Sequence, residues 1–136
     1  MKTKTINFFL QVIFWIILHN SYLKADTIFF DSKNIKIEKE GNLIISAKGT
    51  AKIPNQNISI EGDKFLYNKL ISELVVIGNV KFFDKLNNVF INSEKAYYSE
   101  IENTILTEGN TFVNYDSKYE IVSKNVTYNR NTSKVS

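Results

Sequence analysis

The chain has 136 residues, a formal net charge of +3 at pH 7, no cysteine and one histidine, His19. Disulfides, cysteine-ligated zinc and cysteine nucleophiles are therefore excluded. Residues 1–25 hold three of the 17 basic residues and no acidic residue, so 26–136 carries 14 charges of each sign and is neutral. A neutral chain of this kind gives no support to nucleic-acid binding.

The N-terminal residues form a distinct segment. Lys2 and Lys4 precede an apolar run at 6–18, and polar and small residues follow up to Ala25. This layout is typical of a secretory signal, so we expect 1–25 to be a signal peptide and the mature protein to begin at Asp26. The alternative is an uncleaved membrane anchor, but the run is shorter than the roughly 20 apolar residues that a membrane span needs. His19 lies inside this segment, so a histidine site is also excluded from the mature chain.

Beyond the signal, the sequence repeats with a period of about thirty residues. Three glycines recur at nearly equal spacing along the chain: Gly49, Gly78 and Gly109. Three tyrosines recur at the same spacing: Tyr67, Tyr98 and Tyr128. A weaker half unit, between Ile28 and Ile37, precedes the first full unit. A repeat of this length indicates one supersecondary unit stacked on itself around a shared core.

Each unit predicts two strands. In the first, apolar residues alternate on both sides of the glycine, which is typical of a strand with one buried face. The second begins with the same alternation, but its phase changes after a small residue, which is Gly62, Ser93 or Ser123 in the three units. Ile60 and Phe65, for example, lie an odd number of positions apart. We expect a β-bulge at the small residue that bends the strand and keeps both halves facing inward.

Turns rich in Asn, Asp and Ser separate these strands, at 54–56, 68–69, 84–88, 99–103, 114–117 and 129–131. No stretch of eleven or more residues after position 26 has a helical period. The sequence therefore predicts one all-β domain at 26–136, with seven or so short antiparallel strands joined by hairpins. Two ligand-free alternatives stay open: a sandwich whose apolar faces bury each other, and a structural β-solenoid of the cell surface.

Groups that could carry chemistry are sparse. Glu100 and Glu102 are close in sequence, but they fall in a predicted turn, where solvated charges are the expected state. The sequence contains no glycine-rich loop of the kind that cradles phosphates. We expect no enzymatic activity, no catalytic residue, no cofactor and no metal site.

The units resemble a known domain. The patterns A-x-G-x-x-x-I at 47–53, I-x-x-x-G-D-x-x-x-Y at 58–67 and I-G-N-V-K-F at 77–82, followed by V-F-I-N-S-E-K-A-Y-Y at 89–98, are similar to the OstA-like domain. That domain is shared by the lipopolysaccharide-transport proteins LptA and LptC and by the N-terminal part of LptD. The resemblance covers roughly 28–136 and implies a twisted antiparallel β-jellyroll, a V-shaped pair of sheets whose apolar interior carries the acyl chains of lipopolysaccharide.

Within this family, the third unit looks most like the N-terminal region of LptD. The chain ends at Ser136, soon after Tyr128, whereas the spacing from tyrosine to glycine in the earlier units places the next glycine near position 139. We therefore expect the front part of a longer, LptD-like protein of the periplasm and outer membrane. The usual cysteines of LptD are missing, and a complete LptA-like periplasmic bridge is the alternative.

The resemblance and the alternation together predict a binding surface and partners. The inward apolar residues are expected to line a lipid groove across the three units: Ile53, Ile60, Phe65, Val76, Phe82, Ile91, Tyr98, Val113, Ile121 and Val126. The partners expected are lipopolysaccharide, through its lipid A acyl chains, and other Lpt jellyrolls docked on the edge strand near 28–37. The outer membrane is a further partner if the full-length barrel is present. Whether the interior is an open groove or a sealed core stays open.

Overall fold

The computed structural model describes residues 27–136, and the predicted signal peptide lies outside them. These residues form eleven β-strands, all paired antiparallel, and two short 3₁₀ turns, η1 (Lys39–Gly41) and η2 (Pro54–Gln56). The predicted all-β antiparallel class is confirmed. Within 27–136, no helix has the length and apolar character to cross a membrane.

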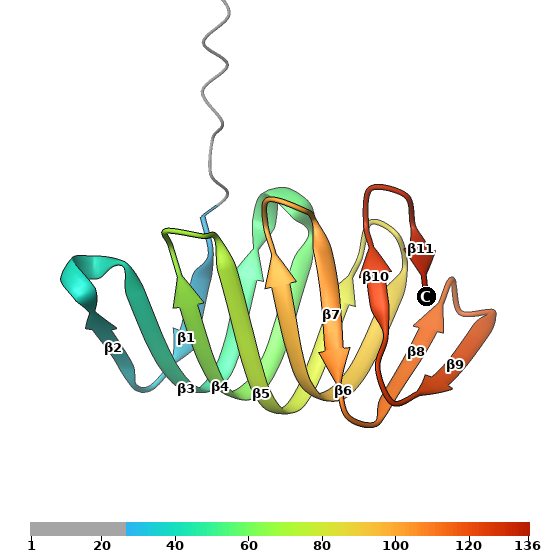
Figure 1. The fold of residues 1–136 in the computed structure, drawn as a ribbon, viewed down its shortest axis with the longest axis horizontal. Helices are drawn as coiled ribbons and strands as arrows, with labels where there is room; N and C mark the ends of the chain where they lie inside the picture. Colours follow the sequence, from blue (N-terminus) through green and yellow to red (C-terminus); the bar gives the residue numbers. More distant parts are fainter. Residues whose placement is uncertain (1–26) are drawn as a thin grey trace, which may run out of the picture.

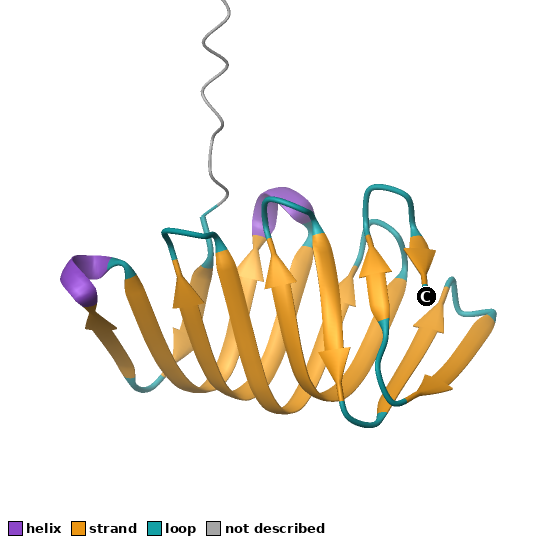
Figure 2. Ribbon diagram, in the orientation of Figure 1, coloured by secondary structure: helices purple, strands orange, loops and turns teal. Residues whose placement is uncertain are grey.

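Four long strands form the centre of the molecule, and each is bent at its middle (Figures 1 and 2). They are β3 (Leu43–Ile53), β4 (Ile58–Asn68), β5 (Glu73–Asp84) and β6 (Val89–Ser99), and they pair in chain order. Because each strand bends, its two halves belong to two different layers. The first layer contains 43–47, 64–68, 73–77 and 95–99, and the second contains 49–53, 58–61, 80–84 and 89–93.

Shorter strands extend each layer separately. In the first layer, β2 (Ile35–Glu38) precedes β3, and β7 (Thr104–Glu108), β10 (Thr127–Asn129) and β11 (Lys134–Val135) follow β6. In the second layer, β1 (Phe29–Ser32) precedes β3, and β8 (Thr111–Tyr115) and β9 (Tyr119–Ser123) follow β6. The strand count exceeds the expected seven because the outer strands are divided at the bend into two pieces, one for each layer.

Around β5 the bend contains a β-bulge, as the change of phase predicted, but the extra residue lies on a different strand, and β3 pairs with β4 in one register throughout. The pairing of β5 with β4 shifts between Glu61 and Lys64, and its pairing with β6 shifts between Ile77 and Val80. The extra residue belongs to β5, where Gly78 and Asn79 both have positive φ, 77° and 48°. The small residues were expected to hold the bulge, whereas they lie opposite or next to it.

The turns gather into two rims, which lie on the side opposite the bends (Figure 1). The first rim consists of the turns at 39–42, 69–72, 100–103 and 130–133, and the second of those at 54–57, 85–88 and 116–118. Successive turns are joined along each rim by backbone hydrogen bonds, such as Glu100 N to Ser72 O (3.0 Å) and Lys85 N to Asn57 O (3.1 Å). Each layer is therefore continuous from its bend to its rim.

Candidate functional site

The apolar interior between the two layers is the first candidate site. Nine of the ten residues predicted to line a groove belong to one core cluster, and each is at most 3% exposed: Ile53, Ile60, Phe65, Val76, Phe82, Ile91, Tyr98, Val113 and Val126. The alternating apolar side chains before and after the predicted change of phase point inward, and Phe65, which follows the change, is one of them. The structure thus brings these side chains together, and their contact with lipid stays a prediction.

Ile121 is the exception, because it lies at the end of the stack. It is 36% exposed, and every residue of β9 is exposed. Ile121 pairs with Val113 of β8, so both side chains lie on the inner face of the second layer. Ile121 also lines a depression of about 420 Å³ together with Tyr115, Tyr119, Ser133 and Val135. The interior therefore reaches the surface at this end.

The two layers touch each other through aromatic rings. Phe30 of β1, in the second layer, lies 6.0 Å from the ring of Phe65 and 6.2 Å from that of Tyr67, both in the first layer. Phe82 of the second layer lies 6.3 Å from the ring of Tyr128 in the first. These contacts join the two layers, and, away from the end at Ile121, the interior between them is packed.

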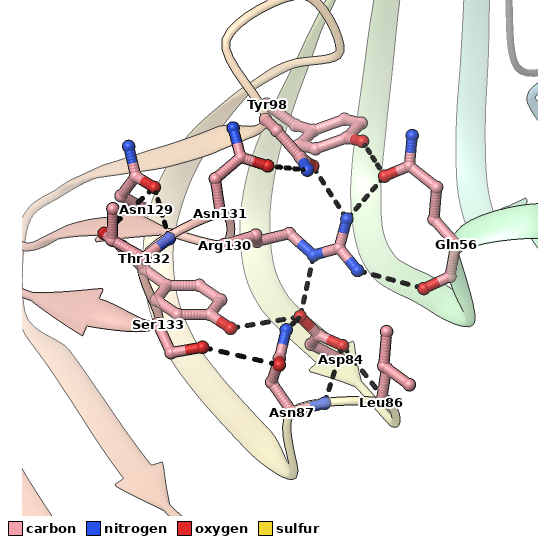
Figure 3. Close-up of polar contacts among 12 residues, drawn as sticks. Gln56, Asp84, Leu86, Asn87, Tyr98, Asn129, Arg130, Asn131, Thr132 and Ser133 are labelled. Atoms are coloured by element: carbon pink, nitrogen blue, oxygen red, sulfur yellow. Dashed lines mark hydrogen bonds and ion pairs between the residues drawn. The ribbon is translucent and has the colours of Figure 1, made fainter.

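The second candidate site is a polar cluster that joins the two rims (Figure 3). We call it the rim cluster, and it consists of Gln56, Asp84, Tyr98, Asn103, Tyr128 and Arg130. Arg130 is at its centre, at the start of the last turn of the first rim. Its Nε donates to Asp84 Oδ2 on the second rim, at 2.7 Å. Its Nη2 donates to the backbone oxygen of Gln56, also on the second rim, at 3.0 Å.

The remaining contacts of the cluster hold these groups in place. Arg130 Nη1 donates both to Gln56 Oε1, at 2.5 Å, and to Asn103 Oδ1, at 2.7 Å. The hydroxyl of Tyr98 donates to the same oxygen of Gln56 (2.7 Å), and that of Tyr128 donates to Asp84 Oδ2 (3.1 Å). The rims are thus joined by side chains and not by a backbone ladder.

Both charges of the cluster are buried. The side chain of Asp84 is 0% exposed and that of Arg130 is 5% exposed. Burial alone would raise the pKa of Asp84, but hydrogen bonds from Arg130 and Asn87 outweigh burial and hold that pKa below its usual value. Burial, and then the charge of the neighbouring carboxylate, raise the pKa of Tyr128, so its hydroxyl remains a donor at neutral pH.

Sequence reasoning missed this cluster, although its signal is present. Asp84 continues the inward alternation of Val80 and Phe82, and Arg130 continues that of Tyr128. Two opposite charges at inward positions predict a buried ion pair. The chain offers few groups for other chemistry: within 27–136, no three His, Cys, Asp or Glu side chains gather as metal ligands.

No protein-family model matches the sequence, and no curated protein sequence matches it. The fold does match solved structures. One is the crystal structure of LptH from Pseudomonas aeruginosa, described as the LptA-homologous periplasmic component of the conserved lipopolysaccharide transport device. The two structures superpose with a TM-score of 0.72 over 82% of this chain and 81% of the LptH chain, at 8% sequence identity. Residues 27–136 therefore have the fold of LptH.

Proposed function

We propose that this protein is a periplasmic carrier of lipopolysaccharide, similar to LptA, which holds the lipid's acyl chains between its two layers. The observation that carries the proposal is a continuous apolar interior in a fold that matches LptH over most of both chains. The match covers 81% of a periplasmic component, which favours the LptA-like reading over the N-terminal part of LptD. Export through a signal peptide at 1–25 belongs to the same proposal.

The interior suits movement of a lipid because its successive units are alike. Burial of each CH₂ group contributes about 0.8 kcal/mol, so several acyl chains would bind without a charged subsite. Matching residues at successive units, such as Ile60 and Ile91 or Tyr67 and Tyr98, present similar surfaces. A lipid could therefore step from unit to unit without entering a deep energy minimum.

Docking of further jellyrolls at the ends of the stack completes the proposed route. Among the described strands, β1 and β2 pair only with β3, and β9 pairs only with β8. An unpaired edge strand can accept a strand of another protein through backbone hydrogen bonds. The partner is another Lpt jellyroll, so that the apolar interiors of the two proteins become continuous.

A ligand-free β-repeat protein is the second candidate function. It is favoured by the tight packing of the interior, where nine of the predicted groove residues are at most 3% exposed. A lipid must displace the contacts between the layers, whereas a purely structural protein would keep them. The two functions therefore differ in whether lipid reaches the interior.

Photo-crosslinking at neighbouring positions tests the proposal. A photo-reactive residue at Phe82 or Ile121 faces the interior, whereas one at Lys81 or Val122, one position away, faces outward. We expect lipopolysaccharide to crosslink at the two inner positions and not at the two outer ones. Ile121 is partly exposed and tolerates a probe without repacking the core. Equal labelling at all four positions, or none at any, would favour the ligand-free protein.

A further inference from the structure

The rim cluster closes the side of the molecule through which a bound lipid must extend. If acyl chains lie between the layers and the sugar head lies in water, the lipid passes between the two rims. Gln56 and Asp84 on the second rim are bonded to Arg130 on the first, and Arg130 is 5% exposed, so this passage is occupied. A lipid therefore cannot pass between the rims at this position while the rim cluster is intact.

The route from the open end meets the cluster directly. Ser133 lines the depression beside Ile121, and its hydroxyl donates to Asn87 Oδ1 across the rims, at 3.4 Å. Asn87 in turn donates through Nδ2 to Asp84 Oδ2, at 2.8 Å (Figure 3). A lipid that enters at Ile121 must separate these rims before its chains can reach the middle units.

The cluster is built so that its two sides can separate without leaving either charged group without a hydrogen-bond partner. Arg130 keeps Asn103 of its own rim as a partner, at 2.7 Å. Asp84 keeps the backbone N–H groups of Leu86 and Asn87 on its own rim, at 3.1 and 3.2 Å. Opening would also return both charges to water, which removes the cost of burying them. No bond of the sheet ladders has to break.

We propose that the rim cluster is a latch that closes the interior and must open before lipid acyl chains enter between the layers. This inference rests on the proposed carrier function. In this structure the latch is closed, with Arg130 bonded to Asp84 and Gln56, and in the lipid-bound protein the rims are apart at these residues.

A reversible staple across the rims tests the latch. The chain has no cysteine, so the variant Asn87→Cys/Ser133→Cys has only the two thiols that replace the facing side chains. They are closed by oxidation or by a short bifunctional thiol reagent, and reduction reopens the oxidised form. A photo-reactive residue at Ile60, in the interior, reports the arrival of lipopolysaccharide. We expect crosslinking to be lost in the stapled form and restored on reduction.

The two hypotheses fail in different ways in this experiment. Equal crosslinking before and after reduction would overturn the latch and leave the carrier function standing. Absence of crosslinking in both forms, and in the chain with only the Ile60 probe, would overturn the carrier function, and the latch with it. Loss of crosslinking only in the stapled form supports both.

A second measurement follows the distance between the two rims and does not depend on crosslinking of the lipid. Spin labels at Lys85→Cys on the second rim and Ile101→Cys on the first, both at exposed positions, measure the distance between the rims. We expect the distance to lengthen when lipopolysaccharide is added, and to be longer without lipid in Asp84→Asn/Arg130→Gln. The control is Glu61→Gln/Lys81→Gln, which removes an exposed ion pair on the outer face and should not change the distance. An unchanged distance in the rim variant would overturn the latch.

Discussion

At the scale of single residues, the molecule tolerates a buried ion pair because its hydrogen bonds are satisfied from both rims. Asp84 accepts from Arg130, Tyr128 and Asn87, and Arg130 donates to three different residues. Because the folded-state pKa of Asp84 lies below its usual 3.8, its contribution to stability is present above that pH. The contribution is lost as the pH falls through the lowered pKa.

Removing one member of the pair should therefore be costly. Arg130→Ala leaves the carboxylate of Asp84 buried without its cation, and we expect a loss of about 3–5 kcal/mol in the free energy of unfolding. Denaturant titration at pH 7 measures it. Lys81→Ala, at an exposed position, is the control and should stay within about 0.5 kcal/mol of the parent. A loss no larger than the control's would show that the pair is not a significant source of stability.

The residues of the interior could be predicted from the sequence, and so could the inward positions of Asp84 and Arg130, whereas the contacts that join them to the other rim could not. The alternation of apolar and polar residues places Ile53 and Phe82 on the inner face regardless of which strands lie next to them. The reason is that the two-residue period of a strand depends only on its own residues. The partners of Arg130 depend on which turns meet. Gln56 is 74 residues and Asp84 46 residues away in sequence, and they approach Arg130 only because the strands bend and bring the rims together.

At the scale of the strand, a hydrogen bond between two side chains supports the bend, and it recurs in two units. Asp63 accepts a hydrogen bond from Asn79 Nδ2, at 2.6 Å, and Glu94 accepts one from Asn110 Nδ2, at 2.9 Å. In both units the acid precedes the asparagine by 16 residues, and a glycine with positive φ comes just before the asparagine. The acid thus lies over a glycine that leaves room for it.

Gly78→Ala should damage this bend in two ways. The residue has φ +77°, and an added Cβ would lie 2.7 Å from Asp63 Oδ2. We expect a loss of about 2–3 kcal/mol in the free energy of unfolding, from backbone strain and from displacement of the carboxylate. Gly41→Ala separates the two effects, because its φ is +91° but a Cβ there meets nothing within 4 Å. Equal losses in the two variants would mean that Asp63 plays no part.

Element boundaries show where local sequence is insufficient. The change of phase correctly predicted that Phe65 and Tyr67 turn inward, as their burial confirms. It did not predict that the extra residue belongs to β5 at Gly78 and Asn79, because a bulge is a mismatch between two strands and not a property of either. The strand count also exceeds the expected seven, because the outer strands are divided at the bend.

At the scale of the whole molecule, the repeat leaves its two ends unlike each other. At the N-terminal end, β1 and β2 pair with successive segments of β3, one in each layer, and both layers end in a strand edge. At the other end, β9 lies exposed beside a depression that leads toward the interior. A stack with different ends favours head-to-tail association, in which each end docks on the opposite end of the next protein.

In β2, at the N-terminal edge, one substitution should affect docking and leave the hydrogen bonds of the sheet in place. Ala47 N donates to Asn34 O, at 3.1 Å. Because hydrogen-bonded pairs alternate along an antiparallel ladder, Lys36 also bonds β3, and the N–H groups of Ile35 and Ile37 point away from it. Ile35→Pro therefore removes an outward donor and keeps the bonds between β2 and β3.

We expect Ile35→Pro to weaken association with a neighbouring Lpt jellyroll, measured by pull-down, while the thermal stability of the isolated protein changes little. Lys36→Pro is the matched variant, because it removes a donor to β3 and should lower stability as well. Unchanged association of Ile35→Pro, at unchanged stability, would mean that β2 is not the docking strand. The corresponding substitution on β9 would then locate docking at the other end, since that strand also has one side without a partner among the described strands.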